Sequence, residues 1–215
     1  MVKCILFDMD GTIQDSERLA TEANRHGFRI VLGCEATPEE LDFLVGKPAL
    51  ATLNSMFPGQ GDLILEHGVE FYLARSHSIT GYSGIVELLE QLREAGFRLG
   101  IVSSKHRRFI VPELESKSLL QFFECIVGQE DTVKHKPDPE PLLLASSVMG
   151  VRPEECVYIG DQPTDVLAAR GAGMVSAGAL WGEGKLEKLA PVDPDLMFKE
   201  PVEVIEFFVS RNLTA

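Results

Sequence analysis

Short apolar runs separated by amphipathic segments dominate the chain. Four of these runs are rich in valine, isoleucine and leucine and have the length of buried strands: CILF (4–7), RLGIV (98–102), ECIV (124–127) and CVYI (156–159). Between them, apolar residues recur at helical spacing, as in IVELLEQL (85–92), which stops before Gly96. Alternating strands and helices predict parallel βα units, and therefore an α/β fold with a doubly wound, Rossmann-like parallel sheet.

Residues 14–80 interrupt this alternation, because they contain helical patterns and turn signals but no convincing strand. Thr37-Pro38-Glu39-Glu40 is typical of a helix start, with a hydroxyl N-cap, a proline at the first helical position and a glutamate that can close a capping box. We therefore expect a core domain formed by residues 1–13 and 81–215, with an α-helical cap domain inserted at 14–80.

The composition is that of a soluble globular protein. Hydrophobic residues make up 45% of the 215 residues and charged residues 25%, which excludes disordered and fibrous classes. The formal net charge is -13, and no lysine or arginine run could neutralise a phosphate backbone, so nucleic acid and membrane surfaces are not expected partners. A small molecule is the expected partner, and the composition leaves open a monomer or a small homo-oligomer.

Cysteine usage and hydropathy predict a cytoplasmic protein. Three of the four cysteines border apolar runs, as buried free thiols do, and none form a C-x-x-C pair. The chain opens directly on an apparent strand without a signal-like apolar region, and no apolar stretch reaches about 18 residues.

Polar residues follow each predicted strand. In chain order these segments are Asp8-Met9-Asp10-Gly11-Thr12, Ser103-Ser104-Lys105, Lys134-His135-Lys136-Pro137 and Gly160-Asp161-Gln162-Pro163-Thr164-Asp165. In a parallel α/β sheet, ligands bind outside the carboxyl ends of the strands. Four acids, a hydroxyl and a lysine should therefore converge at one edge of the sheet.

Each of these residues alone has an ordinary structural role, such as an aspartate that caps a helix. Together they indicate a cation site, because carboxylates about 4 Å apart repel by roughly 4 kcal/mol at an effective dielectric of about 20. Hard oxygen donors without histidine or cysteine in a zinc spacing suit Mg²⁺. Lys136, the Ser103 hydroxyl and the backbone N–H groups of Gly11 and Ser104 are natural phosphate ligands beside it.

The order of these motifs resembles the haloacid dehalogenase superfamily over nearly the whole chain. The four matching motifs are Asp8-x-Asp10-Gly11-Thr12, Ser103 after a strand, Lys136 before Pro137, and Gly160-Asp161-x-x-x-Asp165. The segment 14–80 lies where that superfamily carries its helical cap. A narrower resemblance, to the phosphoglycolate phosphatase and β-phosphoglucomutase-like group, rests on Gly46-Lys47-Pro48, Lys136-Pro137-Asp138-Pro139 and Trp181-Gly182.

The resemblance implies a mechanism. Asp8 would be the nucleophile that forms an aspartyl-phosphate, and Asp10 the general acid and then the general base. The side chains of Asp8 and Asp161 and the backbone carbonyl of Asp10 would hold Mg²⁺, with support from Asp165. The expected phosphate-binding residues are Gly11, Thr12, Ser103, Ser104 and Lys136.

The implied activity is Mg²⁺-dependent hydrolysis of a small phosphorylated metabolite, in the first place a phosphoglycolate-like phosphomonoester. Asp10 favours phosphoryl chemistry over haloacid dehalogenation, which lacks this second acid. A pyrophosphatase, a sugar phosphatase, a β-phosphoglucomutase-type mutase and a non-catalytic phosphate-binding regulatory protein remain as alternatives. Lys47, in the expected cap, is either a substrate contact or a solvated loop lysine. Gln14, Ser104 and Gln162-Pro163 depart from the group's usual residues and leave the substrate open.

Overall fold

The computed structural model describes residues 2–45 and 47–210. It divides into two compact units: one contains the chain up to Asp15 together with the chain from Thr80 onward, and the other is Ser16–Ile79. Gly46, part of the expected Gly46-Lys47-Pro48 motif, lies outside the described residues. Each unit has its own buried core, so we describe them separately.

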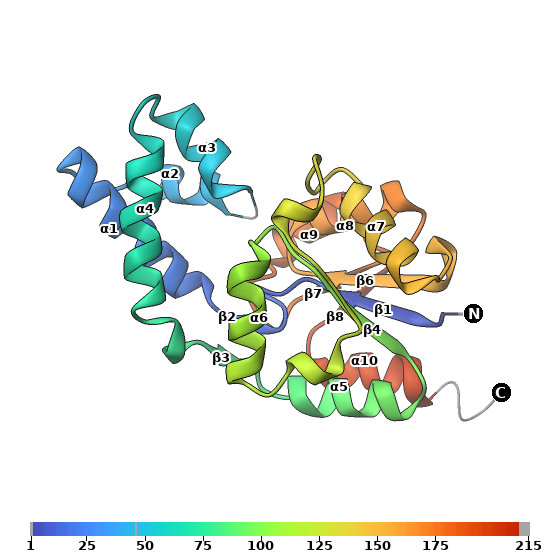
Figure 1. The fold of residues 1–215 in the computed structure, drawn as a ribbon. Coiled ribbons are helices and arrows are strands. Elements are labelled where there is room, and N and C mark those ends of the chain that lie inside the picture. The colour runs from blue at the N-terminus through green and yellow to red at the C-terminus, as the bar shows by residue number, and fades with distance from the viewer. Residues whose placement is uncertain (1, 46, 211–215) are drawn as a thin grey trace. The chain divides into compact units, whose positions relative to one another are not determined.

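A parallel sheet forms the centre of the first unit (Figure 1). Within the described residues it has six strands in the order β5-β4-β1-β6-β7-β8. Their bounds are β1 Cys4–Phe7, β4 Arg98–Val102, β5 Cys125–Val127, β6 Cys156–Gly160, β7 Val175–Ala179 and β8 Leu196–Phe198. The strand order changes direction at β1, which lies between β4 and β6, and such a switch point is where parallel α/β sheets bind ligands.

The four predicted strands correspond to β1, β4, β5 and β6, and the predicted α/β fold class is confirmed. Two short strands contradict the expectation that residues 14–80 hold no strand. These are β2 (Gln14–Asp15) and β3 (Thr80–Gly81), which pair antiparallel. Each has two residues, too few for a period-two pattern to emerge from the sequence.

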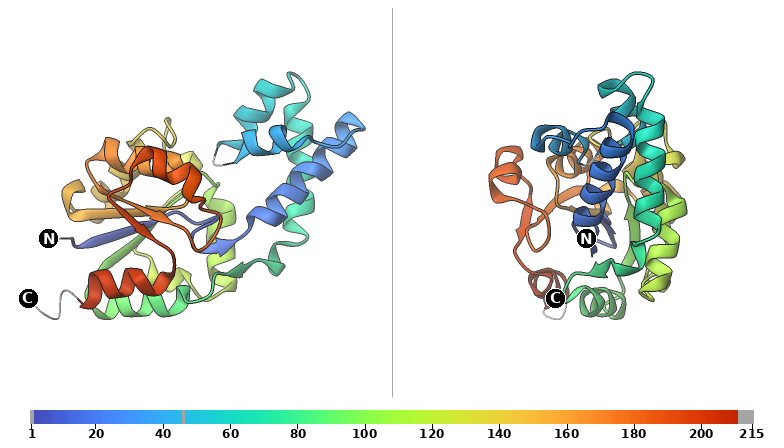
Figure 2. Two further views of the ribbon diagram at one scale, coloured as in Figure 1. Left: turned by 180° about the vertical axis from the view of Figure 1, so that it is seen from behind. Right: turned by 90° about the vertical axis from the view of Figure 1, so that its left-hand side faces the viewer.

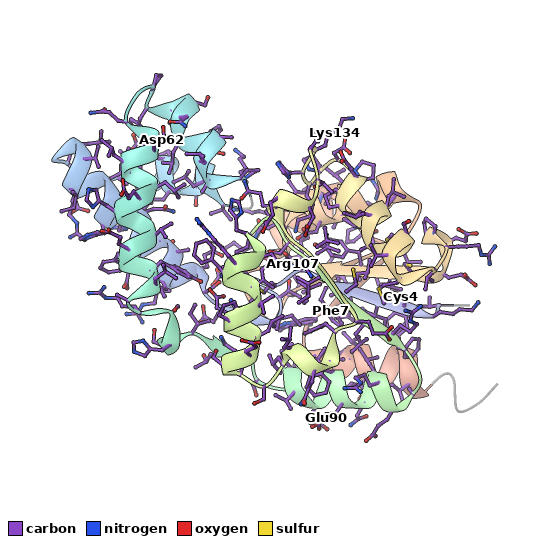
Figure 3. All side chains as sticks on the ribbon, viewed as in Figure 1. Cys4, Phe7, Asp62, Glu90, Arg107 and Lys134 are labelled. Atoms are coloured by element: carbon purple, nitrogen blue, oxygen red, sulfur yellow. The ribbon has the colours of Figure 1, made fainter. Side chains whose placement is uncertain are left out.

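Helices cover both faces of the sheet. Alternate residues of β1 point to opposite faces: Ile5 and Phe7 belong to one core cluster, Cys4 and Leu6 to the other. Cys4 and Phe7 are labelled on β1 in Figure 3. Figure 1 shows α5 and α10 on one face and α7 and α8 on the other. The helices of this unit are α5 Ile85–Glu94, α6 Arg107–Ser116, α7 Glu140–Met149, α8 Pro163–Ala172, α9 Leu186–Leu189 and α10 Pro201–Ile205.

The second unit is helical, with α1 Glu17–Leu32, α2 Pro38–Leu44, α3 Ala49–Met56 and α4 Gly61–Leu73. Helices α1 and α4 run beside one another in both views of Figure 2. At Gly27 they approach so closely that a Cβ atom would overlap the carbonyl of Ile64. The predicted capping box of α2 is confirmed, because the Glu40 N–H donates to the Thr37 hydroxyl (3.2 Å) and the Thr37 N–H donates to the Glu40 carboxylate (2.8 Å).

All four cysteines are free thiols. Cys4, Cys125 and Cys156, which border apolar runs, are buried, whereas Cys34 is exposed. The helices that the structure describes include none with the length and apolar character needed to cross a bilayer.

Candidate active site

Two neighbouring strands each end on an aspartate. Asp8 follows β1, and its backbone N–H donates to the carbonyl of Ile159 (2.9 Å), so the pairing with β6 continues to this residue. Asp161 follows Gly160, the last residue of β6. Because β1 and β6 are parallel neighbours, both carboxylates lie at the same edge of the sheet. Both side chains are buried, with residue exposures of 7% for Asp8 and 2% for Asp161.

A third carboxylate joins them from helix α8. One carboxylate oxygen each of Asp8, Asp161 and Asp165 lies within 4.8 Å of the other two. Asp165 sits in the first turn of α8, where its Oδ2 accepts a hydrogen bond from the Gln162 N–H (2.9 Å) and so caps the helix. Asp165 therefore combines the capping role that is ordinary for an aspartate at a helix start with membership of the acidic cluster.

Lys136 lies between two of these acids. Its Nζ is 3.1 Å from Asp8 Oδ1 and 2.6 Å from Asp165 Oδ1. It also donates to the Tyr158 hydroxyl (2.9 Å), which in turn donates to the carbonyl of Val102 (2.7 Å). The ammonium is therefore held by Asp8 at the end of β1, by Tyr158 of β6 and by Asp165 of α8, and the Lys136 side chain is only 4% exposed.

The charges of this cluster are not balanced by Lys136 alone. Burial raises the pKa of Asp8 to about 7, with further contributions from Asp165 and Asp10, although Lys136 acts in the opposite direction. Burial, together with the neighbouring carboxylates of Asp165 and Asp8, raises the pKa of Asp161. Burial alone would lower the pKa of Lys136, but Asp165 and Asp8 outweigh it and the pKa rises. Three converging oxygen donors with one ammonium fit a hard divalent cation, which would remove the remaining repulsion.

The loop after Asp8 is held against Asp161. The Thr12 hydroxyl donates to Asp161 Oδ1 (3.1 Å), and a Cβ atom on Gly11, whose φ is +83°, would lie 2.6 Å from the same carboxylate. The Gly11 N–H donates to the carbonyl of Gln14 (3.0 Å). These contacts fix the loop beside the acidic cluster, and the phosphate-binding role expected for Gly11 and Thr12 stays a prediction.

Ser103 and Ser104 follow β4, on the other side of β1. The Ser103 N–H donates to the Val127 carbonyl (3.0 Å), and its hydroxyl oxygen accepts the Lys105 N–H (3.2 Å). A hydroxyl that accepts in this way keeps its own proton for donation. Ser103 is buried and Ser104 half-buried.

Asp10 lies outside the group of three acids. Its Oδ1 accepts hydrogen bonds from Gln14 Nε2 (2.9 Å) and Lys105 Nζ (3.1 Å). Both donors also reach Oε2 of Glu113 on α6, at 2.5 and 2.7 Å. The predicted proton-transfer residue thus forms a cluster with two donors and one further carboxylate, that of Glu113.

The sequence interpretation did not assign Gln14, Lys105, Glu113 or Tyr158 to the site. Gln14 was visible only as a departure from an apolar residue. Glu113 carries a usable signal, because it precedes Leu114 on the buried face of α6, where a lone carboxylate would be costly. Tyr158 gives no such signal in the sequence, since a tyrosine in a buried strand is common.

Two further sequence features have defined surroundings. The Trp181 indole N–H donates to the carbonyl of Thr12 (2.8 Å), and Gly182 packs on Gly11 without room for a side chain, so this loop supports the Asp10–Thr12 loop. Lys47, in the helical unit, is exposed, and its Nζ lies 3.3 Å from the centre of the Phe43 ring.

Comparison with known proteins places this arrangement in a family. The chain is 31% identical over 209 residues to the pyrophosphatase PpaX of Bacillus pumilus and 30% identical over 209 residues to PpaX of Anoxybacillus flavithermus, each match covering 95% of both chains. A crystal structure of a predicted phosphoglycolate phosphatase from Haemophilus somnus superimposes with a TM-score of 0.86, covering 96% of this chain and 97% of that one at 21% identity. Residues 5–179 match the model of the haloacid dehalogenase-like hydrolases, and the chain belongs to that family.

Proposed function

We propose that this hydrolase is a Mg²⁺-dependent phosphatase that cleaves a small phosphorylated metabolite through an aspartyl-phosphate. The observation that carries the proposal is the buried trio of Asp8, Asp161 and Asp165 with Lys136 bridging two of them. This combination provides a carboxylate nucleophile and a fixed ammonium group, that of Lys136, at one edge of the sheet. Structural burial of three acids without such a use would be costly.

Asp8 is the proposed nucleophile. One carboxylate oxygen forms a bond to phosphorus while the bond from phosphorus to the leaving oxygen breaks, and the leaving oxygen keeps the electron pair. The Lys136 ammonium, 3.1 Å from Asp8 Oδ1, favours the ionised carboxylate that this attack needs. Strand β1 fixes the direction of approach, because Asp8 is still hydrogen-bonded to β6.

Asp10 is the proposed proton-transfer residue. It gives a proton to the leaving oxygen in the first step. In the second step it takes a proton from the water that attacks phosphorus, which releases inorganic phosphate and restores Asp8. The two acids are separated by one residue and directly follow β1, so both lie near the same edge of the sheet.

The proposed Mg²⁺ ligands are the carboxylates of Asp8 and Asp161 and the backbone carbonyl of Asp10, with Asp165 in support. When bound, Mg²⁺ would offset the negative charge of the acids and of an incoming phosphoryl group. The Thr12 hydroxyl orients the Asp161 carboxylate by donating a 3.1 Å hydrogen bond to its Oδ1.

Ser103, Ser104 and Lys136 are the proposed partners of the phosphoryl oxygens. The Ser103 hydroxyl oxygen accepts a hydrogen bond from the Lys105 N–H, so its proton remains free to be donated to a phosphoryl oxygen. Lys136 supplies positive charge. Such preorganised donors stabilise charge as it develops in the transition state. Gly11 and Thr12 complete the proposed phosphate-binding set, and their contacts with Asp161 support this by fixing the loop beside the acidic cluster.

We assign residues 1–13 and 81–215 to the catalytic core and 14–80 to a cap that selects the substrate. The separate compact unit Ser16–Ile79 supports this assignment. A cap of this kind excludes bulk water and carries residues that read the part of the substrate beyond its phosphate. Lys47 is our candidate for such a residue.

Two substrates head the proposal. The narrower sequence resemblance favours a phosphoglycolate-like phosphomonoester. Inorganic pyrophosphate is the second candidate, because two relatives with 30% and 31% sequence identity over 95% of this chain are named pyrophosphatases. Both have a phosphorus–oxygen bond that the same two aspartates can cleave, so the difference must come from groups that contact the rest of the substrate.

The test is phosphate release from phosphoglycolate, pyrophosphate, several sugar phosphates and p-nitrophenyl phosphate, with Mg²⁺ and with chelator. We expect Mg²⁺-dependent release that falls by more than about 10³-fold in Asp8→Asn, while the circular dichroism spectrum stays unchanged. Release that persists in Asp8→Asn would contradict the mechanism. Transfer of phosphate between two sugar hydroxyls, without release, would identify a mutase instead.

A further inference from the structure

Glu113 is a carboxylate on the core-facing side of helix α6. Its residue exposure is 6%, and its neighbours on the same face, Ile110 and Leu114, are completely buried. Figure 3 shows the start of this helix at the labelled Arg107, next to the sheet. Burying a carboxylate is unfavourable unless it is paired and hydrogen-bonded, so its partners show what it does.

Two donors that contact Glu113 also hold Asp10. Lys105 Nζ lies 2.7 Å from Glu113 Oε2 and 3.1 Å from Asp10 Oδ1. Gln14 Nε2 lies 2.5 Å from the same Glu113 oxygen and 2.9 Å from the same Asp10 oxygen. Two donors therefore bridge two carboxylates, and each donor has its direction set by both acids at once.

Gln14 is tied to the Asp10 loop through its backbone as well. Its carbonyl accepts the Gly11 N–H (3.0 Å), and its N–H donates to the Met9 carbonyl (3.1 Å). Its Oε1 is buried and accepts no hydrogen bond from any residue that the structure describes. Leaving a buried acceptor unmatched is costly, so what the Gln14 amide contributes here is its N–H group, which donates to both acids.

A simple ion pair of Lys105 with Glu113 would explain neither the second donor nor its unmatched oxygen. An ion pair alone would also not require that Gln14 and Lys105 both donate to the same oxygen of Asp10. The arrangement instead restricts the Asp10 carboxylate, which is the more mobile of the two acids because its side chain is 34% exposed, against 6% for Glu113. The buried acid provides the fixed point and the exposed acid is the one that is oriented.

We propose that Glu113 is a positioning residue that holds Gln14 and Lys105 and, through them, sets the orientation of Asp10 for proton transfer. The inference rests on the proposed function, in which Asp10 moves the proton. Its consequence is specific to steps in which a proton is transferred. Attack by Asp8 on a substrate whose leaving group needs no proton is not affected.

Substrates with different leaving groups separate these steps. p-Nitrophenolate departs without protonation, so its burst in the first turnover reports attack by Asp8 alone. The steady-state rate then depends on water attack on the phosphoenzyme, which needs Asp10 as base. An alkyl phosphate needs Asp10 in both steps, because its leaving alkoxide must be protonated.

The experiment uses the full chain with Mg²⁺ and compares wild type with two variants. Glu113→Gln keeps the size of the side chain and removes its charge. Gln14→Met keeps the length of the side chain and removes the hydrogen-bond donor. We expect the nitrophenolate burst to stay within about threefold of wild type. The steady-state rate and the kcat for an alkyl phosphate should fall about 10- to 100-fold, part of the roughly 10²–10⁴-fold that acid–base catalysis supplies. KM for the alkyl phosphate should change little.

Glu115→Gln, an exposed glutamate on the same helix, is the matched control and should leave all three rates unchanged. The double variant Glu113→Gln/Gln14→Met should lose less than the product of the single losses, because both act on the same carboxylate. Equal losses in burst and steady state, or no loss in either, would overturn the positioning role. Absence of phosphate release from wild type would overturn the proposed function itself, a separate result.

Discussion

Lys136 shows how much one residue can organise at this site. Its ammonium contacts Asp8, Asp165 and Tyr158, and the tyrosine connects it to the end of β4. Removing the charge would leave two buried carboxylates without this partner, which is more costly than the loss of a surface ion pair. The phosphoryl-binding role that we propose for Lys136 would therefore use the same ammonium group that stabilises the buried acids.

Metal binding should be visible in stability as well as in activity. The raised pKa values of Asp8 and Asp161 reflect burial together with neighbouring acids, and a divalent cation would relieve that repulsion. At about 100 times its Kd, Mg²⁺ would add about 2.7 kcal/mol to the free energy of unfolding, or roughly 5–10 °C in Tm. Asp161→Asn should lose most of that increase while being at least as stable as wild type in chelator.

Thermal unfolding with about 10 mM Mg²⁺ and with chelator measures both effects. Asp62→Asn, at an exposed position in the first turn of α4, is the control and should keep the full increase in Tm. An equal increase in wild type and Asp161→Asn would show that the cation binds elsewhere.

Glu155 gives a pH-dependent prediction away from the site. Lys3 Nζ (2.7 Å) and Arg152 Nη2 (3.1 Å) lie beside its Oε1, and these contacts, with Arg152 first, lower its pKa to about 2 from an ordinary 4.5. A carboxylate with a lowered pKa stabilises the fold above its unfolded pKa and loses this contribution as pH falls. The cost of Glu155→Gln should therefore be constant above about pH 5 and shrink between about pH 4.5 and 2.

Urea unfolding at about pH 7, 4 and 3 tests this prediction. Glu154→Gln, an exposed neighbour that contacts Arg152 at 3.0 Å, is the control, and surface pairs of that kind contribute little. A cost of Glu155→Gln that grows as the pH falls would have the opposite sign to the one expected for a lowered pKa.

The site residues that could be foreseen are those fixed by strand ends. Asp8, Ser103 and Asp161 each follow an apolar run directly, and parallel strands bring such positions together without further information. Glu113 and Gln14 could not be paired in this way, because they meet through the packing of α6 on the sheet, and one sequence does not specify which helix faces which loop.

At the scale of elements, the strands of the parallel sheet that escaped prediction are one made mostly of small residues and one that is very short. Strand β7 reads VSAGA and β8 has only three residues, LMF. Small residues serve in β7 because other elements pack close to it: at Gly178 a Cβ atom would lie 3.2 Å from the Leu189 side chain. A pattern built on valine, isoleucine and leucine detects strands such as β1 and β6, but not a strand of small residues such as β7.

Gly160 links the end of β6 to the start of α8. A Cβ atom there would overlap the Asp165 carboxylate, which caps α8 and bonds to Lys136. Gly160→Ala should therefore displace Asp165, destabilise the fold by about 1–3 kcal/mol and weaken Mg²⁺ binding. Calorimetric titration with Mg²⁺ and urea unfolding measure the two effects.

Gly171→Ala is the control for this substitution. It adds the same methyl group inside α8, where the nearest atoms belong to Pro139 at 3.4 Å. The better helix propensity of alanine should leave this variant as stable as wild type or up to about 1 kcal/mol more stable. Unchanged Mg²⁺ affinity in Gly160→Ala would show that Asp165 tolerates displacement and is not needed at the cation site.

At the scale of the whole molecule, the chain leaves and re-enters the first unit once. The crossing is marked by β2 and β3, whose residues Asp15 and Thr80 pair directly before and after the helical unit. The break in strand–helix alternation predicted an inserted segment because a loss of pattern is visible in sequence. The pairing of β2 with β3 was not visible, since its two ends are separated by the whole insertion.

The last prediction concerns substrate choice and the inserted unit. Lys47 is exposed and stacks its ammonium on Phe43, so its removal should not unfold the unit. If the unit selects the substrate, Lys47→Ala should raise KM for phosphoglycolate or pyrophosphate about tenfold or more, because either has a second anionic group that an ammonium can bind. Hydrolysis of p-nitrophenyl phosphate, whose ring carries no such group, should change less than about threefold.

Arg25→Ala removes another exposed positive charge from the same unit and controls for a general change in charge. A selective effect of Lys47→Ala, absent from Arg25→Ala, would assign substrate recognition to a particular lysine and not to the net charge of the cap. Equal losses of activity on the anionic and aryl substrates would instead show that Lys47 does not recognise the substrate. The choice between phosphomonoester and pyrophosphate would then depend on residues of the core, such as Ser104 and Lys105, which follow the strand next to that of the nucleophile.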